Sequence, residues 1–136
     1  MTSMEALALR VDAQLGGSVR RVASLGDEVA YEVEPAALLG VCRALRDTPE
    51  LKFEMLVDVA GVDYLHYGRD EWQTSSATRS GFSRGRVVRS DTPDPNMAGR
   101  FGVTYNLLSI ANNQRLRLRV KCPDTQEPVV DSVVGV

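Results

Sequence analysis

The chain has 136 residues, of which 43% are hydrophobic and 25% charged, an ordinary composition for a globular protein. This length suits one domain that buries a core without disulfides or metals. The net charge of -2 lacks the basic excess that a dedicated nucleic-acid binder usually carries.

The two cysteines, Cys42 and Cys122, lie far apart in the sequence and form no Cys-x-x-Cys pair. They are too few for a disulfide framework and have no metal-ligand spacing. An iron–sulfur cluster needs about four thiolates. We therefore expect reduced cysteines in the core and no cluster bound by this chain alone.

Targeting and membrane signals are missing from the sequence. No apolar run approaches the roughly 20 residues of a membrane span. The N-terminus also lacks the basic and then hydrophobic pattern of a signal peptide. We expect a soluble chain that starts in the cytoplasm.

The N-terminal residues predict a helix followed by a hairpin. Thr2 and Glu5 have the spacing of a capping box, and apolar residues then recur at helical spacing up to Gly16. After this helix, Val19–Leu25 and Val29–Val33 flank a turn that contains glycine. Two short apolar runs around such a turn indicate antiparallel strands.

A second helix and a third strand come next. Pro35 suits the first turn of a helix, and Pro49 ends it. The apolar run Phe53–Tyr64 then predicts a strand, with a bend or bulge near Gly61. Because a helix connects the second and third strands, these two could pair in parallel within a mixed sheet.

Residues 66–100 differ in composition from the rest of the chain. They are rich in Ser, Thr, Gly and Arg, and no period of 2 or 3.6 persists. We interpret them as a flexible loop inserted into the domain. Trp72 and Phe82 are isolated large aromatic residues within it, and they are candidate anchors for a partner.

Two strands, Phe101–Ser109 and Arg115–Cys122, close the domain around a turn rich in asparagine. The second strand strictly alternates apolar and basic residues, which predicts one buried and one charged face. The four basic residues are a candidate partner interface, because like charges on one face repel each other unless acidic groups lie across them. They are Arg115, Arg117, Arg119 and Lys121.

The element order predicts an α+β fold, a two-layer sandwich in which two helices cover one face of a mixed sheet. The order is α-β-β-α-β-(long loop)-β-β. Residues 1–122 form the single domain, and 123–136 begin a C-terminal extension. The basic face has two alternative roles, a solvated surface paired with acids on neighbouring strands or a docking surface for a protein. RNA is a third, weaker alternative because the face lacks aromatic stacking residues.

One local cluster resembles an acid–base or metal site, and it consists of Asp58, Asp63, Tyr64 and the single histidine, His66. In an extended chain, Asp58 and Asp63 point to opposite faces because they are five residues apart. We therefore interpret both as structural polar residues that bind the backbone where the strand bends. No nucleotide-binding or hydrolase motif is present.

The strands also carry positions that resemble one family, the 30-kDa-type (C-type) subunit of proton-translocating NADH:quinone oxidoreductase, respiratory complex I. In this family a Trp-containing stretch and a Glu-Arg-Glu signature follow, so we expect an N-terminal domain of a longer subunit. The matching positions are Phe53, Leu56, Asp58, Gly61, Val62, Asp63, Tyr64, Phe101, Tyr105, Leu107, Leu108, Ser109, Pro128 and Ser132.

The resemblance implies a non-redox structural subunit of the peripheral arm, which supports electron transfer from NADH to quinone coupled to proton translocation. Expected partners are the 49-kDa-type (D-type) subunit and neighbours of the B and I types. The location implied is the cytoplasmic side of the bacterial inner membrane, with membrane contact only through the complex. NADH, FMN, iron–sulfur clusters and quinone would bind other subunits, so this chain is expected to have no catalytic, cofactor-binding or metal-binding residues. The alternative is a free-standing protein- or RNA-binding module.

Overall fold

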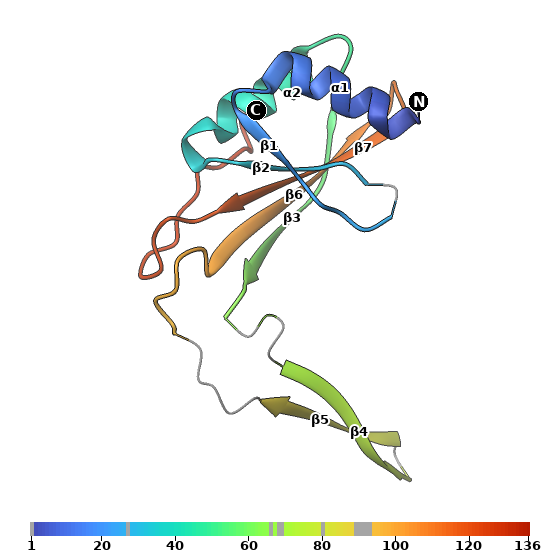
Figure 1. Ribbon diagram of the computed structural model, residues 1–136, viewed down its shortest axis with the longest axis vertical. Helices are drawn as coiled ribbons and strands as arrows, with labels where there is room; N and C mark the ends of the chain where they lie inside the picture. The colour runs from blue at the N-terminus through green and yellow to red at the C-terminus, as the bar shows by residue number, and fades with distance from the viewer. Residues whose placement is uncertain (1, 27, 66, 68–69, 80, 89–93) are drawn as a thin grey trace.

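The structure, a computed structural model, describes residues 2–26, 28–65, 67, 70–79, 81–88 and 94–136. In these residues two α-helices lie on one face of a five-stranded sheet (Figure 1). The predicted two-layer α+β sandwich is confirmed. The elements are α1 (Ser3–Leu15), β1 (Val19–Val22), β2 (Ala30–Val33), a 3-10 turn (Pro35–Ala37), α2 (Leu38–Asp47), β3 (Met55–Asp63), β4 (Asp70–Thr78), β5 (Gly81–Val88), β6 (Phe101–Ser109) and β7 (Gln114–Lys121).

The helix α1 begins as the sequence predicts. The Thr2 hydroxyl accepts a hydrogen bond from the Glu5 amide at 3.2 Å, and the Glu5 carboxylate accepts one from the Thr2 amide at 2.7 Å. These bonds satisfy two amides at the helix start and hold the pKa of Glu5 below its usual range. Leu7, Val11 and Leu15 form the buried side of this helix.

The strand order of the sheet is β1-β2-β7-β6-β3. The β2–β7 pair is parallel and the other pairs are antiparallel, so the sheet is mixed, as predicted. The parallel partner of β2 is β7, however, and β3 lies at the opposite edge. Because β7 supplies the buried residues Leu116, Leu118 and Val120, a central place in the sheet buries the most apolar surface.

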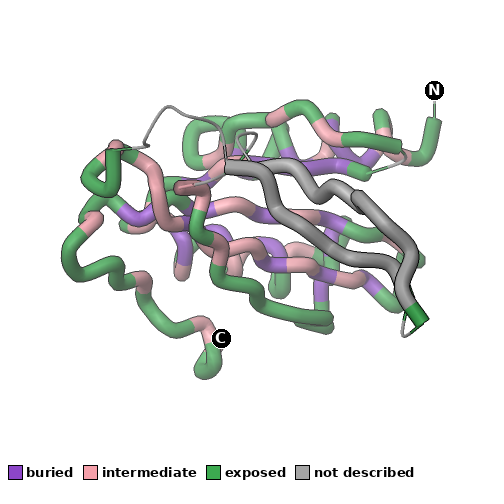
Figure 2. The backbone as a smooth tube through the Cα atoms, turned by 90° about the horizontal axis from the view of Figure 1, so that it is seen from below, coloured by how far each residue is buried: buried purple, intermediate pink, exposed green. Residues whose placement is uncertain are grey.

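The core lies between the sheet and the helices. Buried positions alternate with half-buried ones along the central strands (Figure 2). Tyr31 of β2 and Leu118 of β7 lie side by side in the sheet, and both are at most 1% exposed. Leu38, Val41 and Leu45 of α2 cover them from the helical layer.

Two details of the strands differ from the sequence prediction. The bulge in β3 lies between Leu56 and Asp58, not near Gly61, and Val57 is the extra residue. The insertion is not wholly without secondary structure, because β4 and β5 pair as an antiparallel hairpin within it. A ribbon of Ser, Thr and Arg residues with no core to face shows no apolar period, so the pattern did not indicate strands.

The C-terminal segment, residues 123–136, has no helix or strand among its residues, all of which the structure describes. Val130 and Val133 are half-buried against the core cluster. Val133 and Val136 line a small hollow together with Cys42, Phe53 and Leu56. The segment therefore returns to the helical layer beside α2, where the chain's last residue lies (Figure 1).

Candidate protein-docking surface

The face of the five-stranded sheet opposite the helices, here called the open face, carries the alternating basic residues of β7. The apolar partners Leu116, Leu118 and Val120 are buried on the helical side, which confirms the predicted alternation. We call the four basic residues the basic stripe: Arg115, Arg117, Arg119 and Lys121. Arg115 and Lys121 are exposed, whereas Arg117 and Arg119 are half-buried between neighbouring strands.

Acidic residues before and within β2 lie next to the basic stripe. Arg117 forms an ion pair with Glu28 at 3.0 Å. Glu32 is the register partner of Arg119, but its ion pair, at 2.9 Å, is with Arg20 of β1. In the described part of the chain, the other three cations of the stripe have no ion pair. The open face is therefore only partly neutralised by its own acids.

A chain of hydrogen bonds crosses the open face from β3 toward β2. The Asn106 amide nitrogen donates to Asp58 at 2.8 Å, and the Arg117 Nε donates to the Asn106 carbonyl oxygen at 3.1 Å. Glu28 completes the chain through its ion pair with Arg117. These groups line a hollow of about 240 Å³. Asp58 thus orients Asn106 and, through it, the guanidinium of Arg117.

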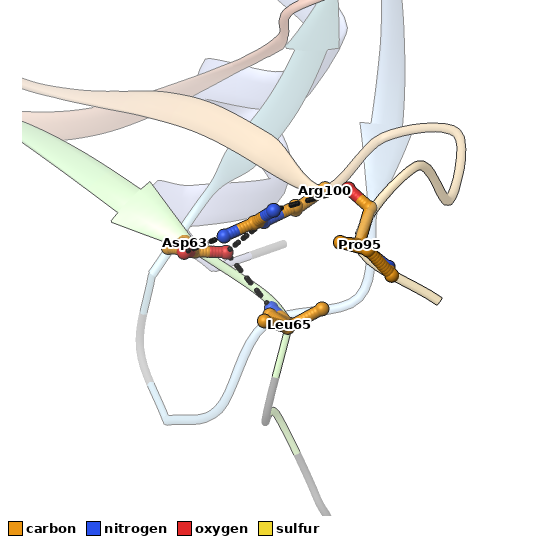
Figure 3. Close-up of polar contacts among 4 residues, drawn as sticks. All are labelled: Asp63, Leu65, Pro95 and Arg100. Atoms are coloured by element: carbon orange, nitrogen blue, oxygen red, sulfur yellow. Dashed lines mark hydrogen bonds and ion pairs between the residues drawn. The ribbon is translucent and has the colours of Figure 1, made fainter. Parts of the chain in front are cut away.

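Asp63 lies on the other face of β3, as its spacing from Asp58 predicts. Its register partner is Phe101, on the helical side, whereas Asp58 pairs with Asn106 on the open face. Arg100 donates two hydrogen bonds to the Asp63 carboxylate, both at 2.9 Å, and a third to the Pro95 carbonyl at 3.0 Å (Figure 3).

The same carboxylate also binds backbone where the strand ends. Asp63 Oδ1 accepts a hydrogen bond from the Leu65 amide at 3.0 Å, and the Tyr64 amide donates to the Arg100 carbonyl at 2.7 Å (Figure 3). The bidentate Asp63 carboxylate raises the pKa of Arg100. These bonds join the end of β3 to the start of β6, at the base of the insertion that carries β4 and β5.

Asp63→Asn is expected to loosen the base of this insertion without unfolding the domain. The change removes the charge that fixes Arg100 in two hydrogen bonds. Hydrogen exchange followed by mass spectrometry should show the Tyr64 and Leu65 amides exchanging roughly tenfold faster. The matched control is Asp47→Asn, which breaks a similar pair with the adjacent Arg46 on the surface of α2. Unchanged exchange at Tyr64 and Leu65 would contradict the structural role of Asp63.

Three residues that the sequence singled out lie outside what the structure describes. His66 is not described, and the side chains of Trp72 in β4 and Phe82 in β5 are not described either. The hypothesis that the two aromatic residues anchor a partner stays a prediction. Among the described residues, no group of His, Cys, Asp and Glu is arranged to hold a metal ion.

The cysteines of the described core are both free thiols. Cys122 is buried, and burial raises the pKa of the half-buried Cys42. A raised pKa keeps a thiol protonated and unreactive at neutral pH. In the described residues, no helix combines the length and the apolar character needed to cross a bilayer.

These features define a class, an α+β domain that presents a charged sheet face on one side and a helical layer on the other. A family model described as the 30 Kd subunit of respiratory-chain NADH dehydrogenase matches residues 31–136. The chain belongs to this family, which confirms the resemblance that the strand positions indicate.

Curated relatives carry the same family name. The NADH-quinone oxidoreductase C subunit of Halorhodospira halophila is 39% identical over 148 residues, which cover 100% of this chain and 60% of the relative. The C subunit of Hydrogenovibrio crunogenus is 45% identical over 113 residues, covering 81% of this chain and 50% of the relative. The matches thus span 50% to 60% of these relatives.

A solved trypsin-resistant fragment of Nqo5 has a similar fold. It superposes with a TM-score of 0.58 at 19% sequence identity, covering 98% of this chain and 80% of the fragment. At this identity the likeness supports the architecture alone. It shows that an experimental structure has the same arrangement of helices and sheet.

Proposed function

We propose that this chain is a non-redox structural subunit of the peripheral arm of an NADH:quinone oxidoreductase, respiratory complex I. In this role it holds neighbouring cluster-bearing subunits in place, and the electron transfer from NADH to quinone belongs to the assembly. The observation that carries the proposal is the family match over residues 31–136. Subunits of the 49-kDa type (D type) and of the B and I types are the proposed partners, at the cytoplasmic side of the bacterial inner membrane.

The open face is the proposed docking surface for such a neighbour. Arg115, Arg119 and Lys121 are cations without an ion pair in the described part of the chain, so an acidic surface can pair with them. Glu28 and Glu32 interrupt the positive charge on the same face. A nucleic acid would meet repulsion at these carboxylates, which favours a protein partner.

Arg115→Glu combined with Arg119→Glu is expected to leave the domain folded and to weaken docking by roughly tenfold or more. Arg117 is kept because it holds Glu28 and Asn106 in place. The full-length protein would be tagged in its own host, and the membranes gently solubilised. Co-purifying subunits and NADH:quinone reductase activity would then be measured in the eluate.

The matched control is Arg21→Glu combined with Arg43→Glu, which changes the net charge equally at exposed positions off the open face. We expect this control to recover the assembly as the unchanged protein does. Equal recovery with the Arg115 and Arg119 variant would overturn the docking surface. A tagged protein found alone in the soluble fraction would overturn the proposed function itself.

A further inference from the structure

The two edges of the five-stranded sheet differ in a way that the fold of this chain does not require. The edge strand β1 has four residues, including Arg20 and Arg21. Short length and charge are the usual protection of an edge against pairing with another chain. The other edge, β3, has nine residues and contains no lysine or arginine.

The strand β3 exposes large apolar side chains on both of its faces. Met55 is 45% exposed and lies on the open face, and Val59 is 49% exposed on the helical side. Leu56 and the bulge residue Val57 are 40% and 48% exposed. A long apolar edge strand with an unpaired backbone is a ready template for one more strand.

Gly61 provides a second, independent observation on the same edge. A Cβ added at Gly61 would meet no atom within 4 Å, so the packing of this chain does not demand a glycine there. Glycine within a strand often marks a place where another backbone approaches closely. In this chain, no atom of the described residues makes that approach.

We infer that β3 is completed in the assembly by an extended segment of a neighbouring subunit, which adds as a further strand along Met55–Asp63. The segment should carry apolar residues toward both faces of the sheet and basic residues among them. This inference rests on the proposed function and adds the surface and the mode of binding.

The charge of the edge selects the chemistry of the partner. Its charged groups, Glu54, Asp58 and Asp63, are all acidic. In an antiparallel pair between two copies of this chain, these carboxylates would lie along the same short interface, and like charges there are unfavourable. A segment with lysine or arginine is attracted to the same groups, so a different subunit fits better than a second copy.

The first experiment measures hydrogen exchange of the β3 amides in the full-length protein, alone and within the purified assembly. We expect amides of Met55–Asp63 to exchange at least roughly tenfold more slowly in the assembly. A photo-crosslinking amino acid placed at Val59 should yield one adduct, a basic and apolar segment of another subunit. Equal exchange in both states, in a chain that does co-purify with the assembly, would overturn the inference and leave the proposed function intact.

Two variants test the same edge by recovery of the assembly. Val57→Lys combined with Val59→Lys places charge on exposed positions, as natural edges do, and should reduce recovery roughly tenfold. Gly61→Val should keep the melting temperature of the free chain, since the space is open, and also reduce recovery. Leu9→Lys combined with Ile110→Lys is the control, at residues that are 56% and 66% exposed away from β3. A dimer of the free chain with protected β3 amides would instead assign the edge to a second copy.

Discussion

Replacing Leu118 with alanine is expected to lower the free energy of unfolding by about 3 kcal/mol. Leu118 is 1% exposed and lies in β7, which has neighbouring strands on both sides. Its register partners are Tyr31 of β2 and Tyr105 of β6, both of which are buried. Strands on both sides prevent the site from collapsing, so the truncation leaves a cavity. Urea unfolding followed by circular dichroism measures the change.

The matched control for this prediction is Leu9→Ala on the outer side of α1. Leu9 is 56% exposed, so the same truncation should change the free energy of unfolding by less than about 0.5 kcal/mol. An equal effect of the two substitutions would show that the loss comes from composition and not from burial. It would also contradict the central position of β7.

The predicted elements follow from local patterns, and the strand order does not. The alternation in β7 and the capping box at Thr2 and Glu5 are signals within a few residues, and the structure confirms both. The pairing of β2 with β7 joins residues more than 80 positions apart, such as Tyr31 and Leu118. Such contacts are decided by the burial of the whole sheet, which no local window contains.

The candidate site shows the same division. The sequence predicts the basic stripe and the opposite faces of Asp58 and Asp63, because both depend on alternation along one strand. Glu28 and Asn106, which bind Arg117, come from other parts of the chain, and only the strand order brings them there. No residue pattern near Arg117 could have indicated them.

The exposed edge is the case in which a sequence pattern indicates the opposite of the structure. A continuous apolar run such as Met55–Val59 is typical of a strand buried on both sides. In this chain it lies at the edge of the sheet with exposed side chains. A composition suited to burial at an exposed position is what a surface covered in an assembly would have.

Replacing Tyr31 with phenylalanine tests the contact between the sheet and α1. The Tyr31 hydroxyl donates toward the Ala8 carbonyl at 3.3 Å and the Asp12 carboxylate at 3.1 Å. Its removal is expected to lower the free energy of unfolding at pH 8 by about 1 to 2 kcal/mol. Tyr67→Phe is the control, because Tyr67 is 78% exposed and should show almost no change.

The effect of this substitution should depend on pH. Burial, helped by the nearby Asp12 charge, raises the pKa of Tyr31 to about 12, above the ordinary value of 10.0. A raised pKa means that the folded state favours the neutral phenol, so this stabilisation is complete below 10.0 and is lost as the pH rises through about 12. The difference between Tyr31→Phe and the unchanged chain should therefore be largest at pH 8 and shrink by pH 11. Urea unfolding at both values measures it, and a constant difference would show that the hydroxyl is not buried against α1.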